Sequence, residues 1–151
     1  MITTDTALLS RLHAECFAEP WDEESFRALL AAPGCFALVD DERLGFIVIQ
    51  VAADQSEVLS LGVRPAARRR GIAAVLLAKA LQGAAERGAA EMFLEVDCMN
   101  FQAIGLYRRY GFEEAGRRKN YYHFSDGSRH DALMLRVEIH APRVGNGMQL
   151  G

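Results

Sequence analysis

The chain has 151 residues, of which 50% are hydrophobic and 25% charged, with a formal net charge of −3 and a pI near 5.8. This length fits one domain, and the composition is that of an ordinary globular protein. No apolar run approaches the roughly 20 residues that a membrane-spanning helix needs. Residues 1–5 lack the basic and apolar pattern of a secretory signal. We therefore expect a cytoplasmic protein that does not associate with membranes.

The candidate metal ligands are scattered. Three cysteines, Cys16, Cys35 and Cys98, lie far apart, and the four histidines have no ligand spacing. This pattern argues against a zinc site and against a disulfide framework, so we expect no metal. The acidic net charge also argues against a DNA-binding protein.

Two helices are predicted first. Apolar residues recur at helical spacing over 6–17, and Asp22 can cap a second helix that ends at Pro33-Gly34. Short apolar stretches separated by polar turns then predict three strands in an antiparallel meander, at 35–39, 44–52 and 57–63.

The second half of the chain alternates helices and strands. Residues 70–88 predict a helix that is apolar around most of its circumference, like one that covers a sheet. After a strand at 92–96, Asn100 can cap a further helix that Gly111 ends. Two last strands are predicted at 112–124 and 130–137, joined by a turn at Asp126-Gly127. The order predicts one α/β domain over 1–140, with a flexible tail at 141–151.

The run Arg68-Arg69-Arg70-Gly71-Ile72-Ala73 lies between a predicted strand and a predicted helix. A helix N-terminus offers unpaired N–H groups and a partial positive charge, and a glycine turn lets a phosphate approach them. The junction therefore favours a pyrophosphate site. A solvated basic turn, or a patch that contacts RNA over Arg64–Arg70, is the alternative.

Two residues farther along could take part in chemistry. Strand alternation places Glu95 and Asp97 on one face, roughly 7 Å apart, and Tyr107 lies about two turns into the next helix. By spacing alone, the two carboxylates also fit a solvated strand face, and the tyrosine also fits core packing.

The pattern Arg68-x-x-Gly71-x-Ala73 resembles the acetyl-coenzyme A (acetyl-CoA) loop of the Gcn5-related N-acetyltransferases (GNAT). Within that family the chain resembles the ribosomal-protein-alanine N-acetyltransferases (RimI-like). The stretches that carry this resemblance are Pro20-Trp21, the loop at 68–73, Leu94-Glu95-Val96 with Asn100, Leu106-Tyr107-x-x-x-Gly111-Phe112, Asn120-Tyr121-Tyr122, Asp126-Gly127 and Asp131-Ala132.

The resemblance implies the acyl-CoA N-acyltransferase fold, a mixed central sheet with helices on both faces. Only about five residues precede the first helix, so we expect the first strand to be short or missing, or the true start to lie upstream. The implied activity is transfer of acetyl from acetyl-CoA to the N-terminal alanine α-amine of a small-subunit ribosomal protein.

The same resemblance implies roles for individual residues. Glu95 would be the general base, and Tyr107 the general acid toward the leaving thiolate of coenzyme A. The residues implied to hold acetyl-CoA are Leu61, Gly62, Val63, Arg68, Arg69, Arg70, Gly71, Ile72, Ala73, Ala74 and Asn100.

The acceptor side is less defined. Tyr121 and Tyr122 are candidates to line the peptide channel, but as neighbours on a regular strand they would point to opposite faces, so we expect at most one to touch the acceptor. Trp21 is either a staple for the second helix or a wall of the acceptor site. Asp97 and Met99 stand where the subgroup usually has Arg and Ser, and we hypothesise that Asp97 favours a basic residue after the acetylated terminus.

Two other functions fit the residues. One is an acetyltransferase for another amine, such as a small metabolite, a drug or a lysine. The other is a non-catalytic acyl-CoA-binding module. Retention of a base candidate, an acid candidate and the loop together favours an enzyme.

Overall fold

The computed structural model describes residues 1–140, and in these residues seven strands form one sheet in the order β1-β2-β3-β4-β5-β7-β6. Neighbouring strands are antiparallel except β4 and β5, which are parallel. The elements are β1 (Ile2–Thr3), α1 (Thr6–Cys16), α2 (Glu23–Ala31), β2 (Cys35–Val39), β3 (Gly45–Ala52), β4 (Gln55–Val63), η1 (Pro65–Ala67), α3 (Ile72–Glu86), β5 (Glu91–Asp97), α4 (Phe101–Arg109), β6 (Glu113–His123) and β7 (Arg129–Glu138).

The first strand is present but only two residues long, so the expectation of a short strand is confirmed and that of a missing one is wrong. Ile2 and Thr3 pair with Leu38 and Ala37 of β2. The strand ends early because Asp5 caps α1, its side chain accepting the backbone N–H of Leu8. The predicted tail at 141–151 lies outside the described residues.

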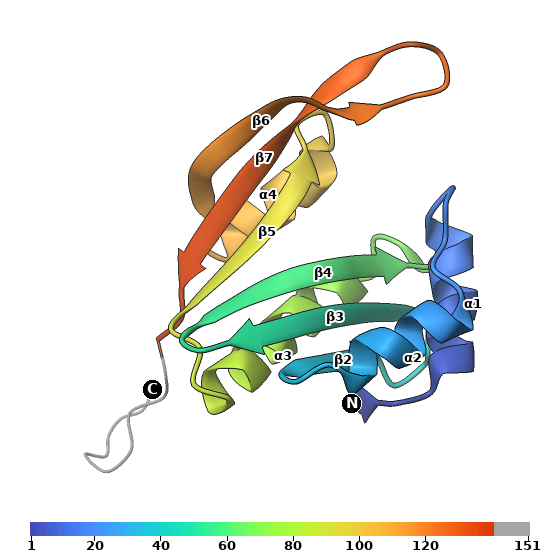
Figure 1. Cartoon of the computed structure of the whole chain (residues 1–151), viewed down its shortest axis with the longest axis vertical. Coiled ribbons are helices and arrows are strands. Elements are labelled where there is room, and N and C mark those ends of the chain that lie inside the picture. The colour runs from blue at the N-terminus through green and yellow to red at the C-terminus, as the bar shows by residue number, and fades with distance from the viewer. Residues whose placement is uncertain (141–151) are drawn as a thin grey trace.

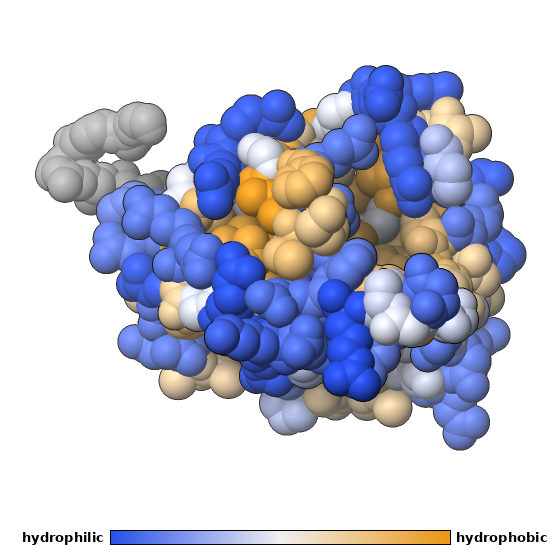
Figure 2. Space-filling view, turned by 90° about the horizontal axis from the view of Figure 1, so that it is seen from above, coloured by the Kyte–Doolittle hydropathy of each residue, from blue (hydrophilic) through white to orange (hydrophobic). Residues whose placement is uncertain are grey.

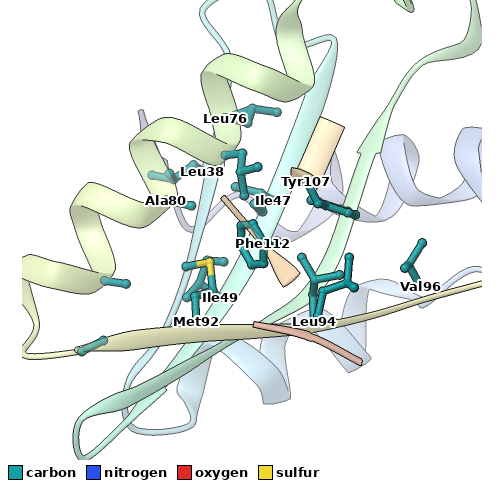
Figure 3. Close-up of a cluster of buried hydrophobic side chains, with 14 of the residues drawn as sticks. Leu38, Ile47, Ile49, Leu76, Ala80, Met92, Leu94, Val96, Tyr107 and Phe112 are labelled. Carbon is teal, nitrogen blue, oxygen red and sulfur yellow. The ribbon is translucent and has the colours of Figure 1, made fainter. Parts of the chain in front are cut away.

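Helices cover both faces of the sheet, as expected (Figure 1). Buried residues of α1 and α2 pack on one face against Ala37, Val39, Phe46 and Val48. On the other face, α3 and α4 pack against alternate residues of β3 and β5, among them Ile47, Ile49, Met92 and Leu94 (Figure 3). Alternate strand residues thus serve two separate cores.

The parallel pair β4 and β5 is joined at one end only. Gln55, Ser56 and Glu57 pair with Glu91, Met92 and Phe93, and beyond them the two strands diverge (Figure 1). The register of β3 against β4 shifts where β4 leaves β5, with one extra residue, Leu59, on β4. A bulge of this kind bends a strand and increases its twist. The result is a V-shaped gap in the middle of the sheet.

The closed end of the gap is held by side chains as well as by strand pairing. The buried Ser56 hydroxyl donates to the Glu91 carbonyl at 2.8 Å. Gln55 Nε2 donates to the Glu91 carboxylate at 3.0 Å, and Arg136 Nε also donates to that carboxylate. These bonds reinforce the pairing of β4 and β5 at the closed end.

Among residues 1–140, no helix is long and apolar enough to cross a membrane. Over the same residues, no group of three or more His, Cys, Asp or Glu side chains is placed to hold a metal ion.

Candidate active site

The open end of the gap leaves one edge of β4 without a strand partner. Residues 58–63 pair with β3 on one side only, because β5 is hydrogen-bonded to β4 no farther than Phe93. Backbone N–H and C=O groups on a free strand edge can pair with another extended, amide-rich chain. The predicted ligand residues Leu61, Gly62 and Val63 lie on this stretch. Seen from above, apolar residues lie in a hollow between hydrophilic rims (Figure 2).

The loop between β4 and α3 exposes a helix N-terminus. Gly71 is the N-cap of α3, with φ +79°, and no side chain caps the helix. A Cβ atom added at Gly71 would meet nothing within 4 Å, so the space above the first turn is open. The partly exposed Ile72, Ala73 and Ala74 form that turn. An anion can therefore approach their N–H groups directly.

The three arginines of the loop differ in what they contact. Arg68 donates from Nε to the carbonyl of Val63 at 3.0 Å, so it braces the loop against the end of β4. Arg69 and Arg70 are exposed, and Arg69 has a left-handed backbone with φ +68°. Among residues 1–140 neither side chain forms an ion pair, and both residues directly precede the N-cap Gly71.

Glu95 lies on the face of β5 opposite the buried Met92, Leu94 and Val96, as alternation predicted. Its Oε2 atom is buried and has no hydrogen-bond partner. That atom lies 3.0 Å from Arg118 Nε, an ion pair whose angles are not those of a hydrogen bond. Both residues line a cavity of about 390 Å³, together with Gln50, Ala52, Gln55, Ser56, Glu57, Phe93 and Met134. Glu95 is thus a carboxylate with one unsatisfied oxygen at the wall of a hollow.

Tyr107 projects from α4 into the core on the other face of the sheet, among residues of α3 and β5 (Figure 3). It is 7% exposed, and burial raises the pKa of its phenol to about 12, with a smaller contribution from Tyr122. The phenol is therefore protonated at any physiological pH. Its ring also packs against Phe112, so the residue has a structural role as well.

Tyr122 is coupled electrostatically to Glu95 on one face of the sheet and to Tyr107 on the other. Burial raises the pKa of its phenol, and the negative charges of Glu95 and Asp97 raise the pKa further. Tyr122 also contributes to the raised pKa of Tyr107. The negative charge of Glu95 thus acts on Tyr122, and Tyr122 in turn acts on Tyr107.

The regular alternation expected for the paired tyrosines is wrong. The register of β6 against β7 shifts between Arg118 and Tyr122, and Asn120 has φ +52°. Asp131 holds this bulge by accepting the Asn120 N–H at 2.9 Å. As a result the rings of Tyr121 and Tyr122 contact each other edge to face, 5.3 Å apart, instead of pointing to opposite faces.

Two other predicted site residues have structural partners. Asn100 caps α4, with its side chain accepting the Ala103 N–H at 3.2 Å. Trp21 stacks on His13, with ring centroids 4.6 Å apart, and the backbone N–H of Trp21 donates to His13 Nδ1. These contacts match the interpretation of Trp21 as a staple between α1 and α2. A role for either residue in ligand binding stays a prediction.

Sequence reasoning missed Arg118 and His130. Arg118 shares β6 with several other cations, and no local signal distinguishes it from its neighbours. His130 Nδ1 donates to Asp97 at 2.8 Å across a sequence distance of 33 residues. Only the strand pairing brings either residue to a carboxylate.

Known proteins resemble this chain over most of its length. The model of the acetyltransferase (GNAT) family matches residues 6–112. The [ribosomal protein bS18]-alanine N-acetyltransferase of Escherichia coli strain K12 is 32% identical over 139 residues, 91% of this chain and 93% of that protein. The crystal structure of the ribosomal-protein-S18-alanine N-acetyltransferase from Escherichia coli has a TM-score of 0.81 and 30% identity, covering 99% of this chain and 96% of that one.

A more distant structure shares the fold. Arabidopsis thaliana NAA60 in complex with acetyl-CoA has a TM-score of 0.76 at 19% identity, covering 92% of this chain and 97% of that one. The family resemblance noted in the sequence motifs is confirmed by the match to the family model and by the Escherichia coli relative. The chain therefore belongs to the acetyltransferase (GNAT) family of acetyl-CoA-dependent N-acetyltransferases.

Proposed function

We propose that this protein transfers the acetyl group of acetyl-CoA to the α-amine of the N-terminal alanine of ribosomal protein bS18. The names of the relatives at 32% identity supply the acceptor. One structural observation carries the chemistry: a free strand edge that leads to an uncapped helix N-terminus, with a carboxylate on the facing strand. The proposal assigns residues 1–140 to one acetyltransferase domain and places it in the cytoplasm, where ribosomal proteins are made.

The co-substrate would lie along the gap between β4 and β5. Its pantetheine amides would pair with the open edge of β4 at Leu61–Val63, and its pyrophosphate would accept N–H groups at the first turn of α3. Arg69 and Arg70 would add positive charge beside the phosphates. This arrangement would direct the thioester into the gap, toward the end where β4 and β5 pair.

Glu95 would act as the base. An α-amine has a pKa near 8, so about a tenth is neutral at pH 7, whereas a lysine near 10.4 is neutral for less than about a thousandth. One carboxylate, directly or through a water molecule, can take the proton that the amine loses as it attacks the thioester carbonyl. The buried Oε2 of Glu95 accepts no hydrogen bond, and its contact is the ion pair with Arg118.

Tyr107 would stabilise the departing sulfur. Its phenol, with a pKa of about 12, is protonated and can donate to the thiolate that leaves as the tetrahedral intermediate collapses. A thiol has a pKa near 8.5, so complete proton transfer from this phenol is uphill by a factor of roughly a thousand or more. A strong hydrogen bond from Tyr107, with the proton delivered as the sulfur is released, fits these values.

The acceptor peptide would enter on the face of the sheet where Glu95 lies. Asp97, Tyr121 and Tyr122 would line that entrance, and Trp21 lies in the connection between α1 and α2, which cover the other half of the same face. We include in the proposal that Asp97 favours a basic residue directly after the acetylated alanine.

Mass spectrometry of peptides after incubation with acetyl-CoA tests the acceptor. One peptide carries the bS18 N-terminus with a free alanine, and a second has the same sequence blocked at its α-amine and extended by a lysine. Acetylation of the free terminus alone supports the proposal. Acetylation of lysine alone contradicts it, and no transfer to either peptide by a protein that binds acetyl-CoA indicates a small-molecule acceptor or a binding module.

A further inference from the structure

Arg118 contacts the buried oxygen of Glu95, Oε2, which has no hydrogen bond. Its Nε lies 3.0 Å from the buried Oε2, although the angle between the groups is poor for a bond. If Glu95 is the base, an α-amine that approaches this oxygen from the cavity meets the Arg118 guanidinium, because both residues line that cavity. The guanidinium therefore occupies the position that the acceptor needs.

The two partners of this ion pair differ in their freedom to move. The Arg118 side chain is 56% exposed, whereas the Glu95 side chain is 23% exposed and fixed on the central strand β5. Arg118 also has a second contact, because its guanidinium carbon lies 5.2 Å from the centroid of the exposed Tyr121 ring. An aromatic face attracts a guanidinium even at an exposed site. Arg118 can thus leave Glu95 without losing every partner.

The Arg118 guanidinium and the ammonium group of the acceptor cannot both lie beside Glu95 Oε2, because both are positively charged. At pH 7 about nine-tenths of a free α-amine arrives as an ammonium ion. An ammonium and a guanidinium that approach one carboxylate oxygen from the same cavity repel each other, and the oxygen has room for one of them. Within residues 1–140, Arg118 forms no ion pair with Glu57, which lines the cavity, or with Asp97, which lies nearby.

We infer that Arg118 is a positioning residue for the acceptor: its guanidinium occupies the ammonium site at Glu95 before the acceptor binds, and leaves Glu95 but keeps its contact with the Tyr121 ring when the N-terminal amine binds. This role rests on Glu95 acting as the base. The ion pair would hold the carboxylate in place against weakly bound cations. A peptide that also contacts the channel can displace the Arg118 guanidinium from Glu95. Arg118 thereby makes binding depend on the whole N-terminus and discriminates against small amines.

The test compares steady-state kinetics of Arg118→Ala with those of the natural protein, at saturating acetyl-CoA. Loss of the competing cation should lower KM for the alanine peptide by about two- to fivefold, the range expected for an ion pair near the surface, with kcat changed less than twofold. Methylguanidinium in millimolar amounts should inhibit Arg118→Ala competitively with the peptide and inhibit the natural protein several-fold less. Lys119→Ala, which removes the next cation on β6, should leave KM unchanged.

Two results would overturn the inference. A higher KM in Arg118→Ala would mean that Arg118 binds the peptide, and a lower kcat at unchanged KM would mean that it orients the base during the reaction. The parallel variant Glu95→Gln separates this question from the proposed function. If Glu95→Gln keeps its full rate, the assignment of the base fails whatever Arg118→Ala does.

Discussion

Asp97 at the end of β5 is paired with His130 at the start of β7. Its Oδ2 lies 2.8 Å from His130 Nδ1, and its Oδ1 accepts the backbone N–H of Met99 at 2.9 Å. One carboxylate therefore ties the β5–α4 connection to the last hairpin. Its side chain is still 24% exposed, so a positive group of a bound peptide can compete with His130 for it.

Acceptor preference should depend on this pair. The natural protein should prefer peptides with Arg over Gln after the alanine, and Asp97→Asn should lose about two- to fivefold of that preference. His130→Ala leaves the carboxylate without the imidazole that contacts it, so the preference should increase. The preference is measured by letting the Arg and Gln peptides compete and by quantifying the acetylated products by mass spectrometry. An unchanged ranking in Asp97→Asn would rule the hypothesis out, and Glu113→Gln, at the other end of the hairpin, is the control.

Gly71→Ala should weaken acetyl-CoA binding. Gly71 has φ +79°, which costs a residue with a Cβ about 1 to 2 kcal/mol, and the added methyl would stand in the open space above the first turn of α3. We expect a rise of about tenfold in the dissociation constant by calorimetry, equivalent to about 1.4 kcal/mol. Gly88→Ala is a matched control at the other end of α3, with φ +93° and equally open space. Gly88→Ala should lose a similar amount of stability but keep its affinity for acetyl-CoA. Equal losses of acetyl-CoA affinity in both variants would contradict a pyrophosphate site at Gly71.

Tyr107→Phe should slow acetyl transfer while the protein stays folded. The ring packing is kept and only the hydroxyl is lost, so the single-turnover rate should fall about a hundredfold or more, at unchanged acetyl-CoA affinity. Tyr110→Phe is the control on the same helix. Its hydroxyl donates to the Ala74 carbonyl at 3.1 Å, so that variant should lose about 1 kcal/mol of stability with little loss of rate. A Tyr107→Phe variant with the natural rate would remove Tyr107 from the chemistry.

Burial of Tyr107 should also make stability depend on alkaline pH. The phenol pKa is about 12 in the folded protein and about 10 in the unfolded chain, so folding favours the protonated form. The contribution is complete below pH 10 and is lost as the pH rises toward and through 12, a change of about 2 to 3 kcal/mol. Urea unfolding between pH 9 and about 11.5 should show a steeper decline in the natural protein than in Tyr107→Phe. Equal slopes would contradict the buried phenol.

His13 should make the fold sensitive to acid. It is buried between Phe17 and Trp21, and desolvation lowers its pKa from 6.5 to about 4. The unfolded chain therefore binds a proton more readily, so this contribution to stability is complete above pH 6.5 and is lost as the pH falls through 4. The loss amounts to roughly 3 kcal/mol. His13→Gln retains an acceptor for the backbone N–H of Trp21. In urea unfolding, its free energy of unfolding should fall less between pH 6.5 and about 4 than that of the natural protein. An identical decline in both proteins would disprove this role of His13.

Local structure was predictable where the determining residues are close in sequence. Asp22 and Asn100 cap their helices through N–H groups three residues away, and Gly111 ends α4 with φ +90°, all as predicted. Strand alternation also placed Glu95 on the face opposite Leu94. In each case the interaction spans a few residues, so the sequence pattern contains it.

The geometry of the site was not predictable in the same way. The gap begins at Glu57 because β4 and β5 diverge there, and pairing between segments some 36 residues apart decides where that happens. The contact of Arg118 with Glu95 depends on the register of three strands, and the tyrosine pair depends on a bulge at Asn120 that Asp131 stabilises. A one-residue change in register would exchange the face of every side chain involved.

The most direct test of the account is acetyl transfer by Glu95→Gln to a bS18 N-terminal peptide, followed by intact-mass measurement in single turnover, with acetyl-CoA affinity measured in parallel. The amide has nearly the same shape as the carboxylate but cannot accept the amine proton. We predict a rate lower by about a hundredfold or more, at a dissociation constant for acetyl-CoA within twofold of the natural protein. A variant that binds acetyl-CoA equally well and acetylates the peptide at the natural rate would contradict the assignment of Glu95 as the base.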